Sequence, residues 1–242
     1  MNDAYIESDL NRPPESLRKV HVMGVCGTAM AALAGMLKER GFEVVGSDQA
    51  AYPPMSVFLE NLGIIVRSGY AAENLDPDVD LVIVGNVIRR DNPEAVEMRR
   101  RRLPFLSLPQ ALSHFFIRDK RSIVVSGTHG KTTTSAMAAW VLECAGLEPG
   151  FMIGGISADF GKNYQVGKGR FFVTEGDEYD TAYFDKGPKF LHYRPELLIV
   201  TNLEFDHADI YRDLDHIKSN FRSLLNLLPE RGMVVALSLI HI

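Results

Sequence analysis

A glycine-rich loop between a predicted strand and a predicted helix constrains the fold of this chain more than any other feature. Residues 122–126 form a short apolar run typical of a buried strand, and residues 132–145 have the apolar spacing of a helix. The loop between them has the sequence Gly-Thr-His-Gly-Lys-Thr-Thr. This order of strand, glycine loop and helix is the one in which main-chain N–H groups and a helix N-terminus surround a phosphate.

The loop therefore predicts a site for a nucleoside triphosphate. Lys131 is expected to reach the β- and γ-phosphates, and the Thr132 hydroxyl is expected to bind Mg²⁺. The full Walker pattern has a further glycine where this chain has Val125, so the loop is a shortened form. The alternative is a glycine-rich turn with a solvent-facing lysine. The residues expected to bind the nucleotide are Gly127, Thr128, His129, Gly130, Lys131, Thr132 and Thr133.

A run of acids follows the predicted strand at 171–174. Glu175, Asp177, Glu178 and Asp180 lie within six residues and repel one another unless something neutralises them. Mg²⁺ prefers carboxylate and phosphate oxygens, and ligands of parallel sheets bind at the carboxyl ends of strands. Because a phosphate loop lies upstream, the run favours a metal or substrate site over a solvated acidic turn.

A second group of polar residues follows the predicted strand at 197–201. Here an apolar run ends in Asn202, Glu204, Asp206 and His207. His207 stands beside an acid at a strand end, and histidine is a common metal ligand. From the residues alone, a metal role and a structural role for His207 stay equally open.

Strands and helices alternate along most of the chain, which predicts an α/β fold with parallel, doubly wound sheets. A Rossmann-like N-terminal domain is expected first, and a P-loop α/β central domain second. The chain ends six residues after a predicted strand at 231–236, before the second sheet has its expected strands, so we expect an incomplete central domain. The predicted organisation is a flexible extension at 1–18, a first domain at 19–118 and a truncated second domain at 119–242.

The first domain has a loop of its own at Gly24-Val-Cys-Gly27, between a predicted strand and a predicted helix. A dinucleotide fingerprint needs glycine at 24, 26 and 29, and this chain has Cys26 and Ala29. The helix N-terminus can still hold a diphosphate, and Asp48 ends the second strand, where an acid often meets a ribose hydroxyl. A uridine diphosphate sugar fits such a site as well as a dinucleotide does. Tight packing without a ligand is the alternative.

Composition and charge exclude several classes of protein. The net charge of −5 argues against a general nucleic-acid binder, which usually carries a basic stripe. Two distant cysteines form no CxxC pair, so we expect reduced thiols and neither a disulfide framework nor a zinc site. Because the chain starts without a signal peptide and has no apolar run of ~20 residues, we expect a cytoplasmic protein without a membrane span.

Taken together, these motifs resemble the Mur ligases. The resemblance is carried by Gly24-x-x-Gly27, Gly46-Ser-Asp48, the loop at 127–133, Glu175-Gly-Asp-Glu178 and Asn202-x-Glu-x-Asp-His207. It extends from about residue 20 to 236. The family has a UDP-sugar domain, a central ATPase domain and a C-terminal domain that helps to bind the incoming amine. The resemblance thus implies that this chain holds the first domain and part of the second, without the C-terminal domain.

The resemblance also implies a reaction and a set of site residues. ATP phosphorylates the lactyl carboxylate of UDP-N-acetylmuramate, and an amine then attacks the acyl phosphate. Lys131 is expected to stabilise the transferring phosphoryl group, Thr132 and Glu175 to hold one Mg²⁺, and His207 to hold a second. The catalytic residues are thus Lys131, Glu175 and His207, and Asn202 is expected to contact the nucleotide. The residues expected to contact the UDP-sugar are Gly27, Thr28, Asp48 and Asn86.

The identity of the amine stays open between two members of the family. Residues 47–60 and 174–211 are most similar to the member that adds the tripeptide L-Ala-γ-D-Glu-meso-diaminopimelate during peptidoglycan recycling. A member that adds L-alanine is the alternative. Several Mur ligases carry a modified lysine after the histidine, and neither Lys218 nor Arg222 gives a clear match. A nucleotide-binding module without turnover is a further hypothesis, and it is what we expect of this chain alone.

Overall fold

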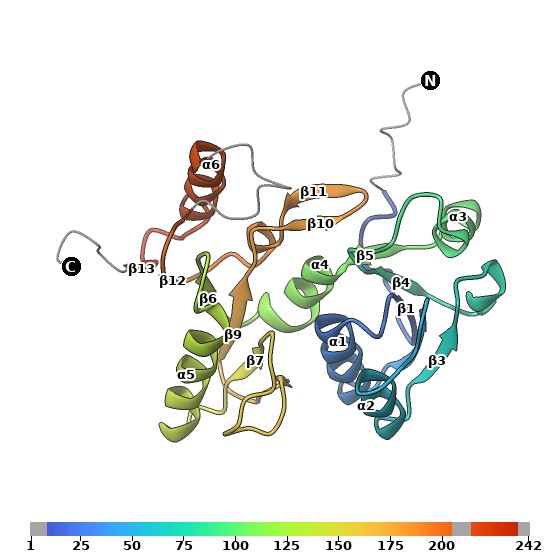
Figure 1. The fold of residues 1–242 in the computed structure, drawn as a ribbon, viewed down its shortest axis with the longest axis horizontal. Coiled ribbons are helices and arrows are strands. Elements are labelled where there is room, and N and C mark those ends of the chain that lie inside the picture. Colours follow the sequence, from blue (N-terminus) through green and yellow to red (C-terminus); the bar gives the residue numbers. More distant parts are fainter. Residues whose placement is uncertain (1–8, 205–213, 237–242) are drawn as a thin grey trace. The chain divides into compact units, whose positions relative to one another are not determined.

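The computed structural model describes residues 9–204 and 214–236, which form two compact units. Residues up to Ala111, together with Thr181–Lys186, form the first unit, and Leu112–Asp180 with the residues from Gly187 onward form the second. Each unit holds its own sheet (Figure 1). No helix in the described ranges is long and apolar enough to cross a membrane.

The sheet of the first unit is parallel throughout, with strand order β3-β2-β1-β4-β5. The chain passes from the β3 edge back to β4 beside β1, so the strand order reverses between β1 and β4. Open α/β sheets bind ligands at the carboxyl ends of the strands at such a reversal. The elements are β1 (Lys19–Met23), α1 (Thr28–Glu39), β2 (Glu43–Asp48), α2 (Met55–Asn61), β3 (Ile65–Ser68), η1 (Ala72–Asn74), β4 (Leu81–Val84), α3 (Pro93–Arg100), β5 (Phe105–Ser107) and α4 (Leu108–Leu112).

Local sequence explains the principal elements of this unit. All five residues of β1 and all four of β4 are buried, as expected for central strands covered on both faces. Helix α1 buries its middle from Met30 to Leu37, and α2 lies beside it (Figure 1). Helix α3 begins after Asn92, whose side chain accepts hydrogen bonds from the N–H groups of Glu94 and Ala95 and so caps the helix.

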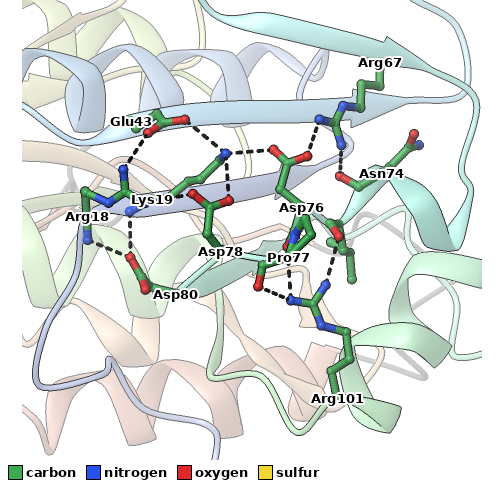
Figure 2. Close-up of polar contacts among 11 residues, drawn as sticks. Arg18, Lys19, Glu43, Arg67, Asn74, Asp76, Pro77, Asp78, Asp80 and Arg101 are labelled. Atoms are coloured by element: carbon green, nitrogen blue, oxygen red, sulfur yellow. Dashed lines mark hydrogen bonds and ion pairs between the residues drawn. The ribbon is translucent and has the colours of Figure 1, made fainter.

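An ion-pair cluster holds the amino end of this sheet together (Figure 2). The Lys19 ammonium at the start of β1 lies 2.9 Å from Asp76, 3.0 Å from Asp78 and 3.1 Å from Glu43. The hydrogen bond with Asp76 contributes most to raising the pKa of Lys19, against the opposing effect of burial. Asp80 accepts hydrogen bonds from the N–H groups of Arg18 and Lys19. These contacts tie the segment before β4 to the starts of β1 and β2.

Two further segments complete the first unit. The Leu10 carbonyl accepts a hydrogen bond from the Phe105 N–H, and the Asn11 side chain donates one to the Phe105 carbonyl, so these contacts anchor the end of the predicted flexible extension. The Phe184 ring meets the Phe105 ring edge to face at 4.9 Å, and the Tyr183 hydroxyl lies 3.1 Å from an Arg99 nitrogen. Tyr183 and Phe184 join β10 (Asp180–Ala182) to β11 (Asp185–Pro188), a two-stranded sheet.

The sheet of the second unit has the order β13-β12-β6-β9-β7-β8. All its pairs are parallel except β7 with β8. A core built around Ile123, Phe151 and Val173 lies between the sheet and α5. The elements are η2 (Ser113–Ile117), β6 (Arg121–Ser126), α5 (Lys131–Cys144), β7 (Gly150–Met152), β8 (Tyr164–Gln165), β9 (Phe171–Gly176), η3 (Lys189–His192), β12 (Leu197–Val200), α6 (Leu214–Leu225) and β13 (Met233–Ala236). The predicted α/β class with parallel sheets is confirmed.

Candidate functional site: two strand–loop–helix junctions

The loop that leads from β6 to α5 is shaped by its two glycines. Gly127 has φ +134°, and a Cβ atom there would lie 2.2 Å from the Thr201 hydroxyl oxygen and 2.7 Å from the Asn202 carbonyl oxygen. Gly130 has φ +79° and stands at the N-cap of α5. A side chain at 127 would therefore break the packing of the loop against the end of β12.

Asn202 holds the middle of this loop. Its side-chain oxygen accepts a hydrogen bond of 2.9 Å from the His129 N–H, and its carbonyl accepts one of 3.3 Å from the Thr128 N–H. The Thr201 hydroxyl donates to the His129 carbonyl at 2.6 Å, and the Thr128 hydroxyl accepts from the Glu204 N–H at 3.0 Å. Two sequence-predicted site segments, the loop and the end of β12, are thus brought together.

Lys131 begins α5 and points back across the loop. Its ammonium donates to the Gly127 carbonyl at 2.7 Å and lies 3.3 Å from a carboxylate oxygen of Glu178. The side chains are only 11% and 6% exposed, so this ion pair is little screened by water. The first turn of α5 carries no acid, and the N–H groups of its first residues have no acceptor within the helix. The start of α5 therefore presents positive charge and main-chain donors together.

Glu175 at the end of β9 lies opposite the second residue of α5. Its carboxylate accepts a hydrogen bond of 2.6 Å from the Gly154 N–H and one of 3.2 Å from the Thr132 hydroxyl. Burial raises the pKa of Glu175, although these two hydrogen bonds act in the opposite direction. The site thus holds a carboxylate in a position where an added cation would compensate for its lost hydration.

The acid run is neutralised in part by lysines, which the sequence interpretation did not foresee. Glu178 pairs with Lys131, and Asp177 lies 3.2 Å from the Lys189 ammonium. Asp177 and Glu178 are therefore less available to a ligand than the metal or substrate role predicted for the run required. Glu175 is left as the acid of the run that faces Thr132.

Oxygen ligands for Mg²⁺ are available at this place. The Thr132 hydroxyl and the Glu175 carboxylate are the hard donors that Mg²⁺ prefers. Gly154 leaves space beside them, because a Cβ atom there would lie 3.2–3.4 Å from the Glu175 oxygens and the Thr132 hydroxyl. These residues fit a phosphate-bound Mg²⁺, which takes few ligands from the protein. A cluster of three or more His, Cys, Asp or Glu side chains suited to a metal is not found among residues 9–204 and 214–236. His207 lies outside the described residues.

The first unit has the second junction, from β1 to α1. Gly27 is the N-cap of α1, Thr28 is its first residue, and both are exposed. The Asp48 carboxylate accepts a hydrogen bond of 2.9 Å from the Cys26 N–H, so it lies against the loop. Asn86 is exposed in the loop after β4 and makes no hydrogen bond to the other three predicted residues in the described part of the chain. The structure thus joins Asp48 to the glycine loop by a hydrogen bond, whereas Asn86 has no such bond to the loop among the described residues.

The sequence interpretation missed three residues near these junctions. Gly154 follows the short strand β7 in a Gly-Gly pair, which is the one local sign of its close approach to Glu175. Tyr70 lies close to the first loop, since a Cβ atom on Gly24 would be 3.8 Å from its hydroxyl. Burial, with a further effect of Asp48, raises the pKa of Tyr70 to about 12. The third residue is Glu94, a buried acid on α3 whose sequence neighbours are mostly charged.

Comparison with known proteins gives a consistent result for both units. Residues 19–120 match the model of the Mur ligase family, catalytic domain, and residues 125–239 match that of the Mur ligase middle domain. The UDP-N-acetylmuramate–L-alanyl-gamma-D-glutamyl-meso-2,6-diaminoheptandioate ligase of Escherichia coli is 48% identical over 90% of this chain and 48% of its own length. The UDP-N-acetylmuramate–L-alanine ligase of Syntrophotalea carbinolica is 37% identical over 90% of this chain and 46% of its own length.

Solved structures agree with this. The crystal structure of UDP-N-acetylmuramate:L-alanyl-gamma-D-glutamyl-meso-diaminopimelate ligase from Neisseria meningitides is 46% identical, with a TM-score of 0.85 over 91% of this chain and 71% of that chain. The chain spans about half the length of the curated relatives it matches. From both family models and this structure, we conclude that the chain belongs to the Mur ligase family.

Proposed function

We propose that this chain is the nucleotide- and sugar-binding part of an ATP-dependent ligase that forms an amide bond. The substrates are UDP-N-acetylmuramate and the tripeptide L-Ala-γ-D-Glu-meso-diaminopimelate. The observation that carries the proposal is the pairing of the first two residues of α5 with two acids, Lys131 with Glu178 and Thr132 with Glu175. A loop that only turned the chain would not need two buried or half-buried carboxylates beside it.

The residues of the second unit would act on ATP. The amides of the loop at 127–133 and the Lys131 ammonium would bind its phosphates and stabilise the charge that develops on the γ-phosphoryl group. Asn202 would hold the loop in the shape that does so. A Mg²⁺ held by Thr132 and Glu175, with His207 at a second ion, would neutralise phosphate charge. The Lys131 ammonium would exchange its partner from Glu178 to phosphate when ATP binds.

The residues of the first unit would bind the UDP-sugar. Gly27 and Thr28 would present main-chain donors to the diphosphate at the N-terminus of α1, and Asp48 would accept hydrogen bonds from hydroxyl groups. Asn86 would contact the ligand from the loop after β4.

In the proposed reaction, a carboxylate oxygen of the sugar attacks the γ-phosphorus and ADP leaves. The amine nitrogen of the peptide then attacks the acyl carbon, and phosphate leaves.

The tripeptide is favoured over L-alanine by the comparisons. The Escherichia coli relative named for the tripeptide is 48% identical to this chain, and the Syntrophotalea carbinolica relative named for L-alanine is 37% identical. The identity is measured over the same share of this chain, so the difference does not come from coverage. L-Alanine is therefore the second candidate.

Phosphate release by the protein extended to the length of its relatives tests the proposal. The protein is given ATP, Mg²⁺ and UDP-N-acetylmuramate, with either the tripeptide or L-alanine. We expect release with the tripeptide and none with L-alanine. Release with L-alanine alone would replace the tripeptide in the proposal, and no release with either amine would contradict the proposed reaction.

A further inference from the structure

A buried carboxylate in the first unit organises the segments around the β1–α1 loop. Glu94 on α3 is completely buried. Its carboxylate accepts hydrogen bonds from the Ser47 hydroxyl at 2.5 Å, the Asn74 side chain at 2.6 Å and the Ala71 N–H at 3.4 Å, and it lies 3.2 Å from a His21 ring nitrogen. Burying a carboxylate without hydrogen-bond partners costs much free energy. Polar partners from β1, β2 and the segment before β4 compensate for that cost.

The same contacts keep the acid ionised. Burial acts to raise the pKa of Glu94, but the hydrogen bonds with His21, Ser47 and Asn74 together lower it below its ordinary value. A full negative charge therefore stands in the interior of the unit, and its donors are held in fixed directions.

Ser47 connects this charge to the glycine loop. Its carbonyl accepts hydrogen bonds of 2.8 Å from the Gly24 N–H and 3.0 Å from the Val25 N–H, while its hydroxyl is held by Glu94. The next residue, Asp48, accepts a hydrogen bond from the Cys26 N–H. Three successive amides of the loop thus depend on the position of the end of β2.

Asn74 connects the charge to the other side of the loop. Its side chain donates to the Gly69 carbonyl at 2.9 Å as well as to Glu94, and the Gly69 N–H donates to the Asp48 carbonyl at 2.8 Å. Tyr70 follows directly, with its hydroxyl beside Gly24. Glu94 therefore fixes the carboxyl end of β2 and the segment at 69–74 relative to each other.

We propose that Glu94 is a positioning residue for the sugar-nucleotide site, which sets the β1–α1 loop and Asp48 in place through Ser47 without touching the ligand. This inference rests on the proposed function, because it takes the ligand of that loop to be UDP-N-acetylmuramate. It assigns a ligand-binding consequence to a residue that lies wholly inside the fold.

The test measures binding of UDP-N-acetylmuramate and of ATP with Mg²⁺ to the chain by titration calorimetry. Glu94→Gln keeps the shape of the side chain and removes its charge. The control is Glu97→Gln, the same change on the same helix, where the acid pairs with Arg100 near the surface. We expect Glu94→Gln to lower the affinity for UDP-N-acetylmuramate at least about tenfold and to leave the affinity for ATP within about twofold. Glu97→Gln should change neither affinity.

A second measurement separates positioning from loss of structure. If Glu94 acts through Ser47, Ser47→Ala alone should lower the affinity for the sugar nucleotide. Added to Glu94→Gln, it should lower the affinity little further, because the effects of substitutions at coupled residues are not additive. The amide signals of Gly24 and Val25 should shift in nuclear magnetic resonance spectra of both variants.

Three outcomes would contradict the inference. If the unmodified chain binds UDP-N-acetylmuramate and Glu94→Gln binds it equally well, the role of Glu94 is wrong and the proposed function stands. If Glu94→Gln loses binding of both the sugar nucleotide and ATP and its melting temperature drops strongly, Glu94 has a general structural role. If the unmodified chain does not bind the sugar nucleotide at all, the proposed function of the first unit fails, and the inference fails with it.

Discussion

Two lysines of equal burial stand at opposite ends of the two parallel sheets, Lys19 at the amino end of the first and Lys131 at the carboxyl end of the second. Both side chains are 11% exposed. The Lys19 ammonium has three carboxylates within 3.1 Å, whereas among the described residues the Lys131 ammonium pairs with one acid, Glu178, at 3.3 Å. A charge surrounded by carboxylates stabilises the fold, whereas the role proposed for Lys131 needs an ammonium that can exchange Glu178 for a phosphate.

The comparison locates the chemistry within the fold. In parallel sheets the loops after the strands converge at the carboxyl ends, where helix N-termini also point. The cluster around Lys19 joins the starts of strands, at the opposite end of the sheet from the loops that lead into the helices. The two lysines are thus a matched pair for experiments, one expected to act on stability and the other on binding.

The largest effect is expected from Lys131→Met. The change removes a charged donor to phosphate, and such a hydrogen bond contributes about 1.5–3 kcal/mol, which corresponds to a loss of about 10- to 100-fold in ATP affinity. Titration calorimetry of the chain with ATP and Mg²⁺ measures it, with Lys168→Met, an exposed lysine of the same unit, as the control. Unchanged affinity in Lys131→Met would remove the main support for the phosphate site.

A smaller effect, on stability, is expected from Lys19→Met. Removing one member of a buried ion pair can cost 3–5 kcal/mol, but Glu43 and Asp78 are about half exposed, so screening should reduce the loss to about 2 kcal/mol. Urea unfolding followed by circular dichroism measures the change, while ATP affinity should stay within about twofold. If Lys19→Met kept its stability and lost ATP binding, the assignment of Lys19 to stability and of Lys131 to binding would be wrong.

The smallest effect is expected from Glu175→Gln in the absence of Mg²⁺, and it depends on pH. Burial raises the pKa of Glu175 above 4.5, so the folded chain binds this proton more tightly than the unfolded chain does. The free energy of unfolding therefore falls as pH rises from about 4.5 through the raised pKa, and the loss persists at higher pH. Glutamine cannot ionise and escapes this loss.

The stability of Glu175→Gln relative to the unmodified chain should accordingly rise with pH and then level off. Melting temperatures between pH 4 and pH 8 measure this difference. A difference that shrinks with rising pH would contradict this prediction, because it would mean that the folded chain without Mg²⁺ favours the ionised form of Glu175 over the protonated form. With Mg²⁺ and ATP added, the order should reverse, because the variant loses a ligand of the ion.

The sequence predicted most long elements because their patterns are local. The predicted strand at 122–126 lies within β6, and the predicted helix at 132–145 differs from α5 by one residue at each end. The three-residue strands β5 and β7 were missed, because their positions are set by pairing with β4 and β9 rather than by an alternating pattern. The β10–β11 pair was missed for a similar reason, since its polar and aromatic residues resemble a loop.

The candidate site was predicted in its chemistry more than in its contacts. Glycine, lysine and threonine in the β6–α5 loop have a spacing that can be seen in the chain itself. The partners of the acids could not be seen, because Lys189 neutralises Asp177 and Gly154 reaches Glu175 only once β9, β7 and the neighbouring turns are folded. Glu94 lies in a segment rich in charged residues, and only the packing of α3 shows it to be buried.

The central claim is that the two glycine loops bind different ligands, ATP at 127–133 and the sugar nucleotide at 24–28. Backbone amide signals of the isotope-labelled chain, followed during titration with each ligand, test it most directly. We predict that ATP with Mg²⁺ shifts the signals of residues 127–133 and that UDP-N-acetylmuramate shifts those of residues 24–28. Shifts of one loop by both ligands, or a first loop that does not respond to the sugar nucleotide, would contradict the account.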